Sequence, residues 1–189
     1  MGNPPYIRVQ NLARYIPQEY EFYRSRHCDL KIASAQLLDK YMLFVERGLS
    51  LLSASGRLGM IIPNKFMTIA TGKQLRGLLT SRYHVSRIVD FGTLQVFPGR
   101  STYTCILIAT PEDVSDFTRL QVASISDFVG SPTEGGATYP STDLTREAWS
   151  FPPEALSEHL AKIADKCTKL SDMANVFVGY RRAMMPRTS

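Results

Sequence analysis

The sequence predicts an α/β fold, because apolar residues recur first with the spacing of a helix and then with that of a strand. The alternation is clearest in the first 110 residues. In chain order we expect a helix near 36–54, a strand near 58–62, a helix near 72–82 and strands near 87–91 and 103–109.

The first helix is predicted from one apolar face. Its members are Leu37, Tyr41, Phe44 and Leu52. Ser34 is the expected N-cap, and Ser55-Gly56 is the expected end, because glycine readily adopts the left-handed conformation that closes a helix.

The strands are predicted from apolar runs between turn signals. The run 58–62 ends at Pro63 and has the length of a buried strand. In the helix that follows, Leu75, Leu78 and Leu79 face inward. A loop over 92–102, which contains Phe97-Pro98-Gly99, joins the last two strands.

The flanking regions carry weaker patterns. Residues 8–33 are polar and aromatic and predict a long loop with some helix. Residues 131–143 are rich in Ser, Thr, Pro and Gly and predict a loop or linker, whereas 153–166 fits a helix. We therefore divide the chain into a domain at 1–110, a connecting segment at 111–169 and a short terminal piece at 170–189.

Composition limits the class of protein. No apolar run approaches the roughly 18 residues of a membrane span, and the N-terminus lacks the apolar stretch of a signal peptide. The three cysteines lie far apart and have neither zinc-site nor disulfide-framework spacing. We expect a cytoplasmic protein with reduced thiols, no metal and no membrane partner.

Positive charge is concentrated in the first 110 residues. They contain 14 Lys and Arg against 6 Asp and Glu, a net of +8, whereas residues 111–189 contain 8 against 11, a net of −3. A basic face suits a polyanion such as DNA, although a solvated charged face accounts for such a surplus in most proteins.

The tetrapeptide Asn3-Pro4-Pro5-Tyr6 carries the most specific chemistry. The exocyclic amine of adenine is a poor nucleophile because its lone pair is delocalised, and two fixed acceptors that hold both N–H groups free that lone pair. The Asn3 side-chain oxygen and the Pro4 carbonyl can be these acceptors, since two proline φ angles keep the turn rigid. Tyr6 can stack on a base drawn out of a duplex. Taken alone, the tetrapeptide could equally be a polyproline-type turn or a ligand for a WW-like module.

The surrounding sequence resembles the gamma-class N6-adenine DNA methyltransferases, in particular the TaqI-like catalytic domain of type IIG restriction–modification enzymes. Residues 2–8 look like motif IV of the amino-methyltransferases. The later matching segments are 39–46, 56–66, 72–76, 88–92, 96–99 and 103–107. Their order and spacing agree over 2–109, which is far more specific than the tetrapeptide.

The resemblance implies a fold, a reaction and site residues. The fold is the C-terminal half of a Rossmann-like S-adenosylmethionine-dependent methyltransferase sheet. The reaction is direct methyl transfer from S-adenosylmethionine to N6 of a flipped adenine in double-stranded DNA. The implied catalytic and base-contacting residues are Asn3, Pro4, Tyr6 and Phe97, and the implied cofactor-binding residues are Pro5 and Phe44.

Three side chains near these motifs have simpler interpretations. Phe44 could equally be core, Asp39 could cap a helix or pair locally, and Asp90 could be solvated at the end of its strand.

Two features depart from the family pattern. In the family, a Gly-rich loop and an acidic ribose-binding residue precede motif IV, whereas here only Met1 and Gly2 do. We therefore expect most of the cofactor site to lie in an N-terminal half supplied in cis or in trans, and the chain alone to have little activity. The segment 170–180 resembles the opening of a target-recognition domain, and the chain ends soon after it.

Two rival hypotheses stay open. The chain could be a non-catalytic DNA-binding or partner-binding remnant, or half of a split methyltransferase, in which the basic surplus persists without chemistry. It could also be an unrelated nucleotide-binding α/β enzyme, although the sequence offers no Gly-rich phosphate loop for one.

Overall fold

The computed structural model describes residues 1–25, 27–34, 39–99, 102–132 and 135–152, together with 156, 159, 162–163, 166–168 and 170–174. Residues 1–150 form one compact unit, and residues 151–189 form a second, in which α7 (Leu170–Met173) lies. No helix in the described ranges is long and apolar enough to cross a membrane.

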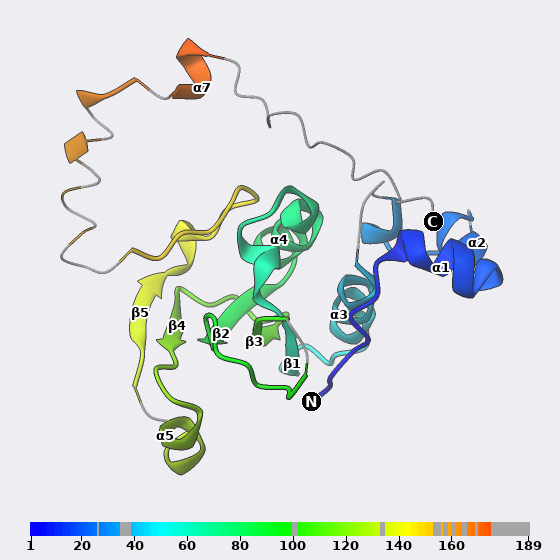
Figure 1. Cartoon of the computed structure of the whole chain (residues 1–189), viewed down its shortest axis with the longest axis horizontal. Coiled ribbons are helices and arrows are strands. Elements are labelled where there is room, and N and C mark those ends of the chain that lie inside the picture. The colour runs from blue at the N-terminus through cyan, green and yellow to red at the C-terminus, as the bar shows by residue number, and fades with distance from the viewer. Residues whose placement is uncertain are drawn as a thin grey trace, which may run out of the picture. The chain divides into compact units, whose positions relative to one another are not determined.

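A mixed five-stranded sheet forms the centre of the first unit (Figure 1). Its strands are β1 (Leu58–Pro63), β2 (His84–Asp90), β3 (Thr104–Thr110), β4 (Asp116–Gln121) and β5 (Ala137–Pro140). Their spatial order is β1-β3-β2-β4-β5. β3 is antiparallel to both β1 and β2, while β4 is parallel to β2. β1, β2 and β4 therefore run in one direction and end at the same edge of the sheet.

The start of the chain lies beside β1. Gly2 pairs in parallel with Met60, through hydrogen bonds from Gly2 N to Gly59 O (2.9 Å) and from Ile61 N to Gly2 O (3.0 Å). Because this pairing is parallel, Asn3 leaves the sheet at the edge where β1, β2 and β4 end.

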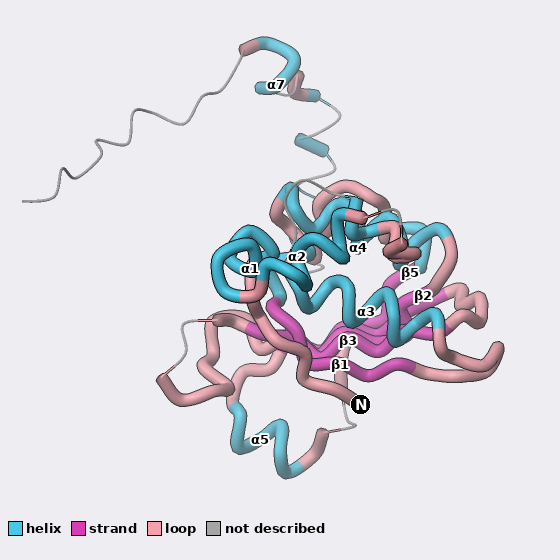
Figure 2. The backbone as a smooth tube through the Cα atoms, turned by 90° about the vertical axis from the view of Figure 1, so that its right-hand side faces the viewer, coloured by secondary structure: helices cyan, strands magenta, loops and turns pink. Residues whose placement is uncertain are grey.

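Helices cover the two faces of the sheet unequally. α3 (Lys40–Ser50) and α4 (Lys73–Ser81) lie on one face, and α5 (Ile125–Gly130) lies on the other (Figure 2). α1 (Val9–Tyr15) and α2 (Pro17–Arg24) form a helical hairpin after the start turn. An ion pair of 2.6 Å between Glu19 and Lys40 ties this hairpin to the beginning of α3.

The core lies between the sheet and the helices α3 and α4. On β3, Cys105, Leu107 and Ala109 are buried, whereas Ile106 and Ile108 between them are half-buried, as the two-residue period of a strand requires. The buried side chains of α3 are Tyr41, Met42, Leu43, Val45, Glu46 and Leu49. Each large apolar side chain contributes about 1.5–3 kcal/mol through this burial.

The predicted α/β fold is confirmed, but the bounds of the first helix differ. Ser34 ends a short 3-10 turn, so its predicted role as the N-cap of α3 is wrong. The carboxylate of Glu46 accepts hydrogen bonds from the amides of Lys31 (2.8 Å) and Ile32 (2.9 Å), which holds this turn as a separate element. α3 also ends at Ser50, before the predicted Ser55-Gly56.

Three elements are not predicted from the sequence, namely β4, α5 and β5. The segment 131–143, predicted as a loop or linker, contains β5. Tyr139 of β5 stacks on Phe117 of β4 with ring centroids 5.6 Å apart, so a tertiary contact stabilises this short strand. The predicted helix at 153–166 and the terminal piece at 170–189 lie largely outside the described residues, and the division at residue 110 stays a prediction.

Candidate functional site

The start turn and the loop between β2 and β3 line one cavity of about 620 Å³. Its lining residues are Asn3, Pro4, Pro5, Tyr6, Ile7, Phe97, Pro98 and Thr102. The turn leaves the sheet where β1 ends, and the loop leaves it where β2 ends. The four residues of the tetrapeptide and Phe97 therefore lie together at one edge of the sheet.

Two hydrogen-bond acceptors of this turn are unused within the described part of the chain. The exposed Asn3 side chain makes no hydrogen bond to any described residue, and the carbonyl of the buried Pro4 accepts none from them. Pro5 is half-buried, and the two prolines restrict the backbone between these acceptors. An acceptor pair on a cavity wall can bind a group that carries two N–H donors, such as an exocyclic amine.

Tyr6 is held on two sides. Its hydroxyl donates a 2.9 Å hydrogen bond to the carbonyl of Ile61, and its ring packs edge-on against Tyr41 with centroids 6.2 Å apart. Burial, and then the negative form of the nearby Cys105 thiol, raise the pKa of Tyr6 to about 12. The hydroxyl therefore stays protonated at neutral pH, and the ring offers the cavity a fixed planar wall.

Phe44 does not line this cavity. It is 41% exposed on α3 and lines a separate apolar hollow of about 470 Å³ together with Phe22, Leu51 and Met60. The ammonium of Lys40 lies 5.9 Å from the centroid of the Phe44 ring. The alternative that Phe44 is simply core is therefore wrong, whereas its cofactor role stays a prediction.

The two aspartates whose roles the sequence did not decide are both buried and form ion pairs. Asp39 occupies the N-cap position of α3 without a side-chain capping hydrogen bond, and it forms a 3.0 Å ion pair with Lys65, which lies beyond β1 in the chain. Asp90 ends β2 and forms a 2.7 Å ion pair with Arg119 of β4. Its 6% exposure shows that the predicted alternative of a solvated Asp90 is wrong.

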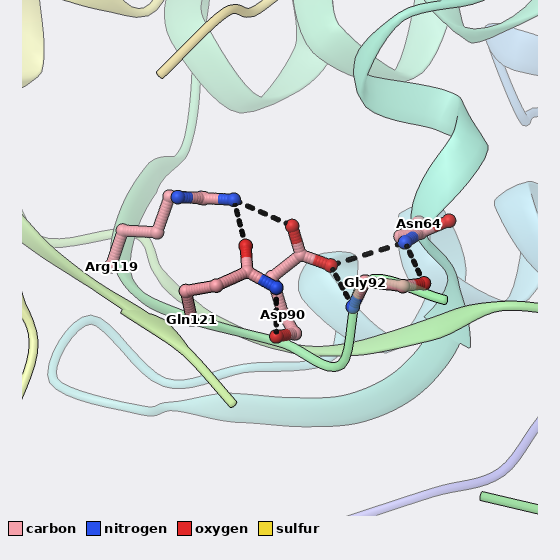
Figure 3. Close-up of polar contacts among 5 residues, drawn as sticks. All are labelled: Asn64, Asp90, Gly92, Arg119 and Gln121. Carbon is pink, nitrogen blue, oxygen red and sulfur yellow. Dashed lines mark hydrogen bonds and ion pairs between the residues drawn. The ribbon is translucent and has the colours of Figure 1, made fainter. Parts of the chain in front are cut away.

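A hydrogen-bonded network around Asp90 joins three strand ends (Figure 3). Its Oδ1 accepts from Asn64 Nδ2 (3.1 Å) and Gly92 N (2.9 Å), while its Oδ2 accepts from Arg119 Nη2. Asn64 Nδ2 also donates to Gly92 O (3.1 Å), and Gln121 Nε2 donates to Asp90 O (3.2 Å). Asn64 could have been found from the sequence because it follows a predicted strand. Arg119 and Gln121 could not, since the sequence does not predict their strand.

The donors and acceptors around the cavity suit a neutral planar ligand. They comprise the Asn3 amide and the Pro4 carbonyl, and Tyr6 and Phe97 add aromatic rings to the lining. No group of three or more His, Cys, Asp or Glu side chains in the described ranges could hold a metal ion.

The fold matches solved restriction–modification enzymes. The type IIG restriction endonuclease BpuSI aligns with 86% of this chain and 21% of its own, with a TM-score of 0.55 and 12% sequence identity. The type IIL restriction-modification enzyme MmeI, solved in complex with DNA, aligns with 74% of this chain and 18% of its own, with a TM-score of 0.51 and 18% identity. At these identities the likeness concerns the α/β fold alone.

The sequence places the chain in a family. The model of the Eco57I restriction-modification methylase family matches residues 1–97, and the chain belongs to this family. The type II restriction enzyme and methyltransferase RM.Eco57I of Escherichia coli is 32% identical over 151 residues, or 79% of this chain. The type II methyltransferase M.PaeR7I of Pseudomonas aeruginosa is 37% identical over 90 residues, or 48% of this chain. The chain spans 15% and 14% of the lengths of these two relatives.

Proposed function

We propose that this chain carries the target-base half of a site-specific N6-adenine DNA methyltransferase of a cytoplasmic restriction–modification system. One observation carries the proposal. Asn3 and Pro4, whose acceptors have no hydrogen-bond partner among the described residues, line the same cavity as Tyr6 and Phe97. Membership of the Eco57I restriction-modification methylase family supports methyl transfer to DNA as the reaction.

The geometry suggests how the turn assists the reaction. A flipped base would stack between Tyr6 and Phe97, with its amine directed to Asn3 and Pro4. Each acceptor would take one N–H of that amine. As the amine nitrogen forms its bond to the methyl carbon, the bond between that carbon and the sulfonium sulfur of the donor would break, and the sulfur would leave with the bonding electron pair. Positive charge would develop on the nitrogen, and fixed acceptors would stabilise this charge without reorganising. The methylated nitrogen would then release one proton to solvent.

The choice of adenine rests on the resemblance to the gamma class. The N4 amine of cytosine also carries two N–H donors, so the acceptor pair alone does not distinguish the two bases. The order and spacing of the motifs over residues 2–109 favour the gamma-class, TaqI-like assignment and therefore N6 of adenine.

S-adenosylmethionine would supply the methyl group when bound. The resemblance assigns Pro5 and Phe44 to the adenine end of this cofactor, and here Pro5 lines the cavity while Phe44 lines the separate apolar hollow. These residues serve only one end of the cofactor. We propose that the remaining contacts come from an N-terminal methyltransferase half, in cis or in trans, whose strands continue the sheet beyond Gly2. The greater length of the relatives is consistent with such a half.

A second candidate function is supported by charge. The net +8 of residues 1–110, from 14 basic and 6 acidic residues, would let the chain bind DNA or a partner without chemistry.

The test combines the chain with the cofactor-binding half encoded in frame upstream of Met1 or in an adjacent reading frame. The protein is incubated with plasmid DNA and tritiated S-adenosylmethionine, and the DNA is digested to nucleosides. We expect the label in N6-methyladenine. Label in a methylcytosine would overturn the adenine assignment, and DNA binding without any label would favour the second candidate.

A further inference from the structure

We infer that Asp90, which accepts hydrogen bonds from Asn64 and Arg119, is a positioning residue. It holds the loop between β2 and β3, which contains Phe97, against the Asn3–Tyr6 turn. This role rests on the proposed function for its ligand, because Phe97 is expected to contact the flipped base. The hydrogen bonds of Asp90 to Asn64, Gly92 and Arg119, here called the clamp, do not depend on that function. They join the ends of β1 and β2 to a side chain of β4.

The loop has few polar anchors apart from this clamp. The Leu94 amide donates to the Phe91 carbonyl (2.9 Å), but none of residues 95–99 makes a hydrogen bond to another described residue. Leu94 and Val96 pack against the apolar cluster that contains Phe91. The direction in which the loop leaves the sheet is therefore set at its first residues, by the bonds of Asp90 and Asn64.

Gly92 shows how closely the clamp fits. Its φ of +55° lies in the left-handed region, and a Cβ on this residue would lie 2.8 Å from Gln121 Nε2. The Gly92 amide bonds to Asp90 (2.9 Å) and its carbonyl to Asn64 (3.1 Å). Both backbone polar groups of Gly92 are therefore fixed by side chains, one from the end of β2 and one from the residue that follows β1.

The charge pair suits a positioning role better than a purely stabilising one. The side chains of Asp90 and Arg119 are only 8% and 15% exposed. A buried ion pair often contributes no more net stability than apolar residues of the same volume, because both charges lose their hydration. Such a pair instead fixes the orientation of its two side chains, since charge-assisted hydrogen bonds are short and geometrically restricted.

Asn64→Ala tests this role, because it removes the two bonds to Asp90 and Gly92 but leaves the Asp90–Arg119 ion pair. Asn11→Ala is the matched control, since Asn11 is exposed on α1. Hydrogen exchange of the chain is followed by peptide mass spectrometry. We expect the hydrogen-bonded amides of Gly92 and Leu94 to exchange at least several-fold faster in Asn64→Ala, while β3 keeps its protection and Asn11→Ala matches the parent.

The second measurement is steady-state methylation of plasmid DNA by the chain with its cofactor-binding half. We expect kcat to fall about tenfold with KM for DNA unchanged, because a displaced contact slows the reaction without removing phosphate contacts. Asn64→Ser, whose side chain is too short to reach both partners, should show the same fall in kcat with an unchanged KM for DNA. This second variant keeps the test valid if the alanine variant misfolds.

Three results would overturn the inference. They are unchanged exchange of the Gly92 and Leu94 amides, faster exchange throughout the sheet, and a loss of kcat that Asn11→Ala shares. If the parent protein transfers no methyl group, the proposed function fails, while the exchange measurement still decides whether Asn64 and Asp90 hold the loop.

Discussion

The hydroxyl of Tyr6 donates a 2.9 Å hydrogen bond to the carbonyl of Ile61, and this bond ties the start turn to β1. Tyr6→Phe should lower the free energy of unfolding by about 0.5–1.5 kcal/mol, because it removes the bond but keeps the ring. Urea unfolding measures this change, with Tyr15→Phe as the control because Tyr15 is 69% exposed.

Methyl-transfer assays distinguish the contribution of the Tyr6 ring to activity from that of its hydroxyl. Tyr6→Phe should retain most of the activity, whereas Tyr6→Ala should weaken capture of the base and slow transfer, since base stacking is worth about 1–3 kcal/mol. Equal activity of the alanine and phenylalanine variants would show that the ring does not contact the base.

The buried tyrosines predict a loss of stability in alkali. Burial raises the pKa of Tyr6 to about 12 and that of Tyr41 well above its usual value, whereas an unfolded tyrosine titrates at about 10. From pH 10 upward to the folded pKa of Tyr6, the native state binds more protons than the unfolded state. Stability therefore falls as pH rises through this window. Urea midpoints at pH 8, 10 and 11 should decrease in that order and decrease less in Tyr6→Phe; an unchanged midpoint would contradict the account.

The guanidinium of Arg76 ties α4 to two segments outside it. Arg76 is only 2% exposed and donates to the carbonyls of Phe66, Ile69 (2.9 Å) and Arg146 (3.1 Å). Arg76→Met should lower the free energy of unfolding by about 3 kcal/mol, because three acceptors lose a charged donor. The exposed Arg57→Met is the control, and an equal small loss in both variants would show that these bonds contribute little.

Glu46 should stabilise the 3-10 turn that precedes α3. Its carboxylate accepts the amides of Lys31 and Ile32, so Glu46→Ala leaves two donors without their partner. We expect the free energy of unfolding to fall by about 1–3 kcal/mol and the amides near 31–34 to exchange faster. Exposed Glu21→Ala should change neither measurement.

Elements with their own apolar repeat could be predicted from the sequence. Leu75, Leu78 and Leu79 of α4 are buried as predicted. β4 and β5 could not be predicted, since Phe117 and Tyr139 are brought together only by the folded chain.

In the candidate site, too, local motifs could be predicted from the sequence and tertiary contacts could not. The Asn3–Tyr6 turn is a local motif, and its resemblance to a family also indicated Phe97. The partners of Asp90 depend on β4 lying beside β2, an order that no local pattern contains. The shared edge of the parallel strands is what brings the local motif and the network together.

Methyl transfer by Asn3→Ala tests the central claim most directly. Asn3 would add one uncharged hydrogen bond to DNA binding, worth about 0.5–1.5 kcal/mol, while most of the affinity comes from phosphate contacts of Lys and Arg. Loss of one fixed acceptor or donor at a transition state costs roughly 2.7–4 kcal/mol, or about 100- to 1,000-fold in rate.

The measurement is tritiated methyl incorporation beside a gel-shift titration at fixed salt, with the cofactor-binding half present. We predict that Asn3→Ala loses methyl transfer to adenine and keeps nearly the parent affinity for DNA, while Asn11→Ala keeps both. Methylation by Asn3→Ala at the parent rate would contradict the account and favour a DNA-binding module.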